Sequence, residues 1–295
     1  YRALQGVVLN ALLTPIFLGL NFWLGRKIWR QWGGYLAVGL WATVPLLPMV
    51  ATSGGFDLLN LVLLLATAIA TYFFLQEPKP ERLNLMILTA VLLAQTRYES
   101  VLFILPVGVC LLVAWWRTQK ILITGSLIAT PLLLLMYPLQ RQIMNDFEGF
   151  WQLPEPGVTP FAAHFVPENL GHAANYFFAW GIEQPNSFLL SVLFLCAGVV
   201  VMIAVGRRSW RIDFSMGAGF GVCFLFVGVV LLNFFLLMAY HWGQLDDIMA
   251  TRLVLPLLLF QVLLVVKACS LLPGSDRIGP ISIVLVIVFY LSVTR

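Results

Sequence analysis

Charged residues are scarce in this chain. They make up 10% of its 295 residues, whereas an ordinary soluble domain has about 25%. Hydrophobic residues make up 61% of the chain, and a soluble fold of this length could not bury so much apolar surface in one core. The composition therefore excludes an ordinary soluble domain and favours a membrane protein.

Cysteine is also rare. The four cysteines lie inside apolar runs, and their spacing fits neither a metal site nor a disulfide framework: Cys110, Cys196, Cys223 and Cys269.

No signal peptide is visible, and the chain begins at Tyr1 with residues that already enter a hydrophobic run. We therefore expect a fragment or a processed form of a longer protein.

Long apolar runs are what the chain has in abundance. Most approach the ~20 residues that a helix needs to cross a bilayer. Because an unpaired backbone amide in lipid is very costly, such spans are expected to be helices. The sequence predicts an all-α polytopic membrane protein, one domain over residues 1–295, with about ten transmembrane helices. The ten runs are 3–24, 33–50, 58–75, 83–95, 101–116, 121–138, 187–205, 214–239, 253–272 and 279–294.

The basic residues fall on alternate connections between these runs. Twelve of the seventeen Lys and Arg lie on one side, and basic residues near helix ends stay cytoplasmic. The rule places the connections 51–57, 96–100, 139–186 and 240–252 outside. The twelve are Arg26, Lys27, Arg30, Lys79, Arg82, Arg117, Lys120, Arg207, Arg208, Arg211, Lys267 and Arg277.

Residues 83–116 allow two interpretations. They could form one long helix with Arg97 in its middle, which would invert every later connection and turn a basic cluster outward. The charge rule therefore favours two short helices that meet near the outer leaflet at residues 96–100.

The segment 139–186 is too long for a plain connection. Pro167 opens a predicted helix in which Leu170, Ala174, Phe177 and Phe178 share one face. We expect an amphipathic helix lying along the outer membrane surface. A spacer that merely rests on the bilayer is the alternative.

Three outer segments carry candidate chemistry. In the first, residues 51–57, Gly54 and Gly55 precede Asp57 at the start of an apolar run. Asp57 is a candidate base, metal ligand or hydroxyl binder, although a carboxylate at a helix N-terminus is also favoured by the macrodipole alone.

The second and third segments contain arginine. The second segment is Arg97-Tyr98-Glu99. A charged Arg at this depth in the membrane is energetically costly unless it has a partner, which could be a phosphate or Glu99. The third segment contains His241, Asp246 and Asp247, with Arg252 following. Arg252 could clamp a phosphate through two hydrogen bonds, or the acidic residues could cap a helix while Arg252 reaches the headgroups.

Four segments of the chain resemble the GT-C superfamily of membrane glycosyltransferases, which includes bacterial aminoarabinose transferases and protein O-mannosyltransferases. Arg2–Gly34 looks like an outer Arg, a helix and a basic turn. Residues 41–57 look like the helix and loop that deliver a second acidic residue. Residues 89–106 look like the following pair of short helices, and 250–256 like the Arg-to-Pro start of a late helix.

The resemblance implies transfer of a sugar from a polyprenyl-phosphate-type carrier to a lipid, glycan or protein acceptor. The active face would be extracytoplasmic, most simply the periplasmic face of a bacterial inner membrane. Arg97 and Arg252 would hold the leaving phosphate, and Asp57 would activate the acceptor or bind a metal. The family's main catalytic acidic residue lies in a first outer loop that this chain is expected to lack. The isolated fragment is therefore expected to be inactive by itself.

A second class of function stays open at this point. The chain could be a transporter, a flippase or a polymerase of lipid-linked glycans, and a non-catalytic membrane subunit is a third possibility. No cofactor is certain, and a divalent cation is the one candidate. The expected partners are the bilayer, the donor and the acceptor, and no nucleic acid.

Overall fold

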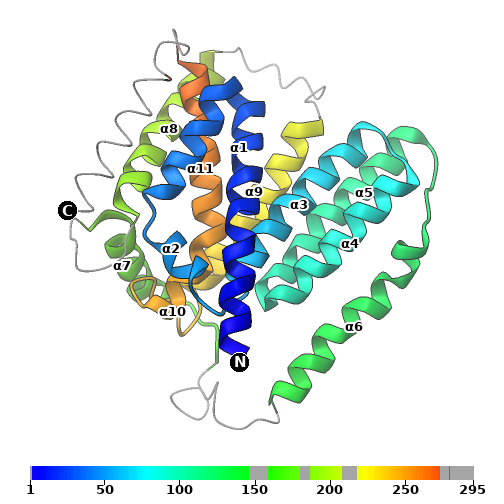
Figure 1. Ribbon diagram of the computed structural model, residues 1–295, viewed down its shortest axis with the longest axis horizontal. Coiled ribbons are helices and arrows are strands. Elements are labelled where there is room, and N and C mark those ends of the chain that lie inside the picture. Colours follow the sequence, from blue (N-terminus) through cyan, green and yellow to red (C-terminus); the bar gives the residue numbers. More distant parts are fainter. Residues whose placement is uncertain (1, 146–158, 180–186, 208–217, 273–278, 280–295) are drawn as a thin grey trace. The chain divides into compact units, whose positions relative to one another are not determined.

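The computed structural model describes residues 2–145, 159–179, 187–207, 218–272 and 279 (Figure 1). Within these ranges every regular element is a helix, which confirms the all-α prediction. Most of the tenth predicted run, 279–294, lies outside the described residues. The elements are α1 (Arg2–Ala42), α2 (Leu46–Ala51), α3 (Asp57–Gln76), α4 (Pro80–Thr96), η1 (Tyr98–Phe103), α5 (Ile104–Thr118), α6 (Gly125–Asn145), α7 (Phe165–Phe178), α8 (Phe188–Arg207), α9 (Ala218–Met238), α10 (Ile248–Thr251), η2 (Arg252–Val254) and α11 (Leu255–Leu271).

Five spans in the described part of the chain are long and apolar enough to cross a membrane. They support an integral membrane protein, while the total of about ten spans stays a prediction. The five are Gln5–Ala42, Asp57–Gln76, Tyr98–Thr118, Gly221–Met238 and Arg252–Leu271.

The long helix α1 is two helices joined by a sharp reversal. The backbone leaves the helical region at Trp29 (φ −146°, ψ 59°) and at Arg30 (φ 40°, ψ −148°). The second half then packs back on the first, with the ring of Trp41 edge-on to Phe17 at 4.9 Å between centroids. The observed reversal confirms that the predicted runs 3–24 and 33–50 are separated at the basic residues. The second run is itself divided, because α1 ends at Ala42 and α2 covers Leu46–Ala51.

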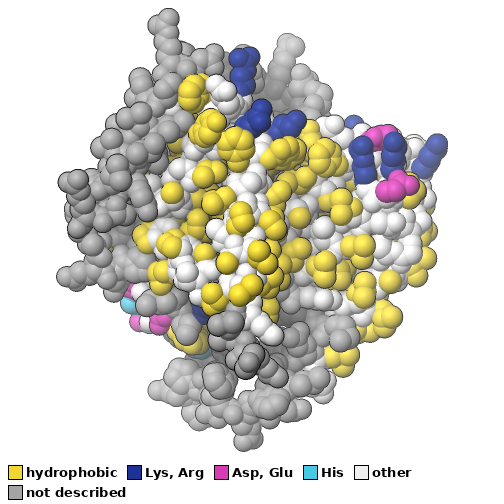
Figure 2. All heavy atoms as spheres, viewed as in Figure 1, with side chains coloured by type: hydrophobic (Ala, Val, Ile, Leu, Met, Phe, Trp, Pro, Cys, Tyr) yellow, Lys and Arg dark blue, Asp and Glu magenta, His cyan; other side chains and the backbone are white. Residues whose placement is uncertain are grey.

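Two glycines allow the halves of α1 to approach closely. A Cβ atom on Gly25 would clash with the carbonyl oxygen of Gly33, and one on Gly33 with the carbonyl oxygen of Gly25. The outer face of this hairpin keeps apolar side chains such as Leu12 and Ile16 exposed, as expected for a surface facing lipid. Figure 2 shows many hydrophobic side chains, in yellow, on the visible face, with Lys and Arg gathered in groups.

The chain divides into two compact units. In the first unit, α11 packs against α1 and α8, and α7 packs against α8. Large side chains such as Phe17 and Trp41 are fully buried there. The first unit comprises Tyr1–Leu58, Ala163–Ile212 and Leu237–Arg295, and the second comprises Leu59–Ala162 and Asp213–Leu236.

In the second unit, α4 packs against α5 and α6. Arg97 has an extended backbone (φ −151°, ψ 149°) that separates α4 from η1. The prediction of two helices over residues 83–116 is therefore confirmed. The following helix, α6, continues to Asn145, seven residues beyond the predicted run 121–138.

The predicted helix at Pro167 exists as α7, and one of the four residues assigned to its membrane-facing side is buried in the structure. Phe177 is buried, whereas Leu170 and Phe178 are 47% and 45% exposed. The buried face also contains Asn169 and Tyr176, for reasons given below. Contact of α7 with a membrane surface stays a prediction.

Candidate active site

The loop between α2 and α3 is fixed against the start of α1. The side-chain amide of Asn10 donates hydrogen bonds to the carbonyl oxygens of Ser53 (2.7 Å) and Gly55 (2.9 Å). Gly54 lies so close to α1 that a Cβ atom on Gly6 would sit 2.7 Å from its Cα atom. Asn10 is fully buried, and its two hydrogen bonds fix the backbone of this loop.

Asp57 is the first residue of α3, and its side chain is 6% exposed. The position favours a carboxylate, because the free amides at a helix N-terminus carry partial positive charge. Its Oδ2 atom lies 3.5 Å from Nη1 of Arg252, whose side chain is 31% exposed. Two residues that the sequence offered as separate candidates are therefore neighbours.

The segment before Arg252 holds this arginine in place. The hydroxyl of Thr251, a buried residue, donates to the carbonyl oxygens of Leu245 (2.8 Å) and Asp247 (2.6 Å). These bonds fold the 245–247 loop onto the start of the helical segment α10–η2–α11. The guanidinium group of Arg252 therefore lies at the N-terminus of α3, although the two are far apart in sequence.

Gly55 lies directly beside the Asp57–Arg252 pair. A Cβ atom there would be 3.0 Å from Oδ2 of Asp57 and 3.6 Å from Nη1 of Arg252. Any larger side chain would therefore cover the carboxylate and the guanidinium group. Gly55 itself adds no side chain that would cover the carboxylate or the guanidinium group.

A histidine that was not among our candidate site residues joins α7 to the loop before Arg252. Nδ1 of His172 lies 2.7 Å from Oδ2 of Asp246, and Nε2 lies 3.9 Å from Oε1 of Glu168. Asp246, predicted to bind substrate, therefore has a protein partner. The four-residue spacing of Glu168 and His172 on a helix was the available signal, but nothing local indicated Asp246.

Further contacts secure the same loop against α7. The side-chain amide of Asn169 donates to the carbonyl oxygens of Met238 (2.9 Å) and Tyr240 (2.8 Å), which explains why this polar residue faces inward. Gly243 has no room for a side chain, because a Cβ atom would lie 2.6 Å from Nδ2 of Asn169. Burial also raises the pKa of Tyr176 well above its usual value.

The other candidates of this segment lie in the same loop. The ring of His241 packs against Tyr240 with 4.4 Å between centroids, and its Nδ1 atom is buried with no hydrogen-bond partner in the described part of the chain. The backbone amide of Asp247 donates to the carbonyl oxygen of Gln244 (3.0 Å). Both residues therefore help to form the turn that precedes Arg252.

Arg97, Tyr98 and Glu99 belong to the second unit. Nε of Arg97 forms an ion pair with Oε1 of Glu99, and each side chain is 17% exposed. Tyr98 is 50% exposed. Of the two partners that the sequence allowed for Arg97, the structure places Glu99 beside it.

Buried hydrogen bonds hold the corner at Arg97. Oδ1 of Asn60 accepts hydrogen bonds from the hydroxyl groups of Thr96 (3.1 Å) and Ser100 (2.8 Å). Asn60 and Ser100 are both buried. Asn60 on α3 thereby fixes the end of α4 and the start of η1, the two sides of the corner.

The described residues contain no group of three or more His, Cys, Asp or Glu side chains arranged to hold a metal ion. The nearest approach to such a group is His172 with Asp246 and Glu168. Asp57, the residue suggested as a metal ligand, has a cation beside it.

Part of the chain matches the model of a known protein family. Residues 2–137 match the family described as dolichyl-phosphate-mannose-protein mannosyltransferase. The match covers three of the four segments on which the resemblance was based, and it excludes residues 250–256. Neither the curated proteins nor the solved structures gave a match. Over a little under half of its length, the chain is therefore similar to membrane glycosyltransferases of the GT-C type, as its sequence motifs predicted.

Proposed function

We propose that this chain is the membrane part of a glycosyltransferase that takes a sugar from a polyprenyl-phosphate-type carrier at the outer membrane face. The observation that carries the proposal is the pairing of Asp57 with Arg252 beside Gly55. Glycosyl transfer from a lipid phosphate needs a cation for the leaving group and a base for the acceptor. This pair supplies one of each.

The proposed reaction uses the two groups in concert. The bond between the anomeric carbon of the sugar and the phosphate oxygen breaks, and the phosphate leaves with the electron pair. Arg252 neutralises the charge that develops on that phosphate, for which a guanidinium group is geometrically suited. The acceptor hydroxyl attacks the anomeric carbon, and its proton passes to Asp57.

Arg252 exchanges partners in this scheme. Without donor it contacts Asp57, and with donor it contacts the phosphate, which leaves the carboxylate more basic. Its partial exposure supports this, because an arginine that is 31% exposed can reorient toward a ligand. Arg97 is proposed to bind donor phosphate more weakly than Arg252, since Glu99 already neutralises it.

His241, Asp246 and Asp247 are proposed to act on the donor through the position of their loop. Asp246 contacts His172 on α7, and the backbone turn that contains Asp247 is bonded to Thr251, next to Arg252. A loop held at both ends fixes where the guanidinium group of Arg252 lies. This assigns Asp246 and Asp247 a positioning role.

The test is sugar transfer by the complete protein in lipid, with a polyprenyl-phosphate sugar as donor. Asp57→Asn should reduce transfer by at least ~10²-fold, the lower range for loss of an acid–base group. Glu77→Gln is the matched control, because it removes an exposed carboxylate that pairs with Lys79 and Arg82. Full activity of Asp57→Asn would reduce Asp57 to a structural residue of the helix start.

The two arginines provide a second arm. Arg252→Lys should raise the Michaelis constant for the donor or lower the rate, because Lys loses the bidentate fork. Arg97→Lys should have a smaller effect. Normal kinetics with reduced thermal stability in both variants would make the arginines purely structural ion-pair partners.

The same assay separates transfer from transport. The family match favours a transferase, which must break the bond between sugar and phosphate. Movement of an intact lipid-linked sugar across the membrane, without release of free polyprenyl phosphate, would instead support the transporter or flippase alternative.

A further inference from the structure

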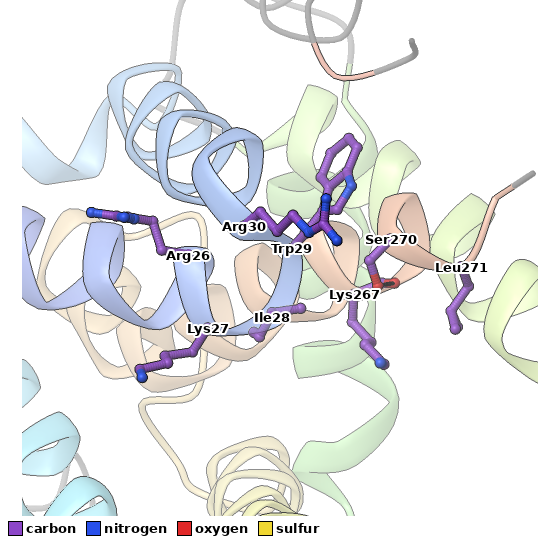
Figure 3. Close-up of a pocket in the computed structure, with 8 residues that line it drawn as sticks. All are labelled: Arg26, Lys27, Ile28, Trp29, Arg30, Lys267, Ser270 and Leu271. Carbon is purple, nitrogen blue, oxygen red and sulfur yellow. Dashed lines mark hydrogen bonds between the residues drawn. The ribbon is translucent and has the colours of Figure 1, made fainter. Parts of the chain in front are cut away.

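An open hollow of about 420 Å³ lies where the turn of α1 meets the last residues of α11. Figure 3 shows the Arg30 side chain extending from the turn toward Ser270 on α11, with the Trp29 ring beside it and Lys267 close by. Arg26, Lys27, Ile28 and Leu271 complete the lining.

The charge of this hollow has one sign. Four of its lining residues are cations, and no carboxylate is among the described residues that line it: the cations are Arg26, Lys27, Arg30 and Lys267. All four are exposed. A concave site lined by cations raises the local concentration of anions, so its ligand is expected to be anionic.

Trp29 gives an independent indication of a ligand. This residue is only 5% exposed, yet its Nε1–H group is buried with no hydrogen-bond partner among the described residues. Buried donors are almost always paired, because an unpaired one loses its hydrogen bond to water without replacement. Trp29 lines the hollow, and the oxygen of a phosphate bound there is an acceptor that this donor lacks among the described residues.

Arg30 is the third observation. Its φ of 40° with ψ of −148° is a conformation that glycine adopts readily and that other residues rarely adopt. Strained residues of this kind cluster at ligand sites, where the side chain rather than the backbone determines the choice of residue. A guanidinium group binds phosphate through two parallel hydrogen bonds.

The surroundings favour a lipid as the source of the phosphate. The hollow lies at the ends of two apolar helical segments, and Leu271 at its rim is 38% exposed. The neighbouring cations rest on aromatic rings, with Arg26 5.9 Å from the centroid of Phe22 and Lys27 5.6 Å from that of Trp23. Aromatic and basic side chains together are typical of the level at which headgroups lie.

We propose that Arg30, Lys267 and Trp29 bind the phosphate headgroup of an anionic membrane lipid. Basic pockets between transmembrane helices are known to bind such headgroups. This site is separate from the Asp57–Arg252 pair, because it lies at the reversal of α1 while Asn10 holds the catalytic loop near the other end of the same helix. It therefore stands whether or not the proposed transferase activity is found.

The experiment titrates the purified full chain in an uncharged detergent with short-chain phosphatidylglycerol, and records the thermal midpoint and bound lipid by native mass spectrometry. Parallel titrations use phosphatidylcholine and inorganic phosphate. The test variant is Arg30→Gly with Lys267→Gln. The control variant, Arg117→Gln with Lys120→Gln, removes two exposed cations that do not line the hollow.

We expect saturable stabilisation by phosphatidylglycerol, little by phosphatidylcholine and little by inorganic phosphate. The half-saturating concentration should rise on the order of 10-fold or more in the test variant, from the loss of two cations near the headgroup level. Trp29→Phe should weaken binding several-fold, and the control variant should behave like the unmodified chain.

Three results would overturn the proposal. Equal weakening in the test and control variants would indicate general attraction to charge. Equal stabilisation by phosphatidylcholine would mean that the net negative charge of the headgroup is not recognised. Full stabilisation by inorganic phosphate would mean that the ligand need not be a lipid. The single variant Arg30→Gly distinguishes misfolding from loss of lipid binding. It relieves the backbone strain and is expected to keep or raise the thermal midpoint of the lipid-free protein.

Discussion

Removing Arg252 should cost stability as well as activity, because Asp57 is buried beside it. At the observed 3.5 Å and an effective dielectric constant of about 20, the attraction between the two charges is about 5 kcal/mol. Desolvation of the buried carboxylate offsets part of this, and the 31% exposure of Arg252 screens more of it. We therefore expect a net coupling of about 1–3 kcal/mol.

A double-mutant cycle measures that coupling. The free energy of unfolding is determined for Arg252→Met, for Asp57→Asn and for the double variant, all in the same detergent. The double variant should lose about 1–3 kcal/mol less than the sum of the two single losses. The exposed pair of Glu77 and Lys79 is the control, and its cycle should give no measurable coupling.

The cycle can also refute the reasoning. A coupling below about 0.5 kcal/mol, which is within the additivity of independent sites, would mean that the two groups do not sense each other. In that case the approach beside Gly55 leads to two unrelated side chains, and the basis of the proposed reaction is lost.

Three other experiments test the architecture. Gly55→Val should reduce sugar transfer at least ~10-fold, because its Cβ atom would lie 3.0 Å from Oδ2 of Asp57 and its side chain would cover the pair; unchanged transfer would place the substrate elsewhere. Asn60→Leu should lower the free energy of unfolding by about 1–3 kcal/mol, because two hydroxyl groups lose their acceptor; a neutral result in chemical denaturation would count against the corner at Arg97. A cysteine placed at Ser53 should react with an impermeant thiol reagent in intact cells and one at Lys79 should not, whereas the reverse labelling pattern would invert the proposed orientation.

Much of the helical layout could be predicted from the sequence because each apolar run carries its own signal. The reversal of α1 was expected at Arg26–Arg30, since a cluster of cations cannot remain within a span. The break at Arg97 was expected for the same reason. Hydrophobicity and charge are local properties, so segment boundaries follow from them directly.

The contacts of the site could not be predicted in the same way. Asp57 and Arg252 are 195 positions apart, and neither has a neighbour in sequence that points to the other. His172 likewise meets Asp246 only because Asn169 binds two carbonyl groups of the following loop. Such pairings depend on how helices pack, which one sequence does not record.

The same limit applies to α7. Its apolar residues Leu170, Ala174, Phe177 and Phe178 were predicted to share a membrane-facing side. Phe177 is instead buried, on an inward side that also contains the polar residue Asn169. An asparagine that satisfies two backbone carbonyls is worth more inside than an additional apolar contact, because unpaired buried carbonyls are costly.

The contact between Gly25 and Gly33 sets the angle between the two halves of α1. It lies far along the helix from Asn10, which holds the loop before Asp57. From Gly25 to Asn10 the helix runs 15 residues, or about 22 Å. A change of about 10° in the angle at the glycine contact would therefore move Asn10 by about 4 Å, which is more than the length of the hydrogen bonds that it makes to the Asp57 loop. A single methyl group added at Gly33 would then act at a distance, and loss of transfer in a variant of this turn would not by itself mark the turn as a place where substrate binds.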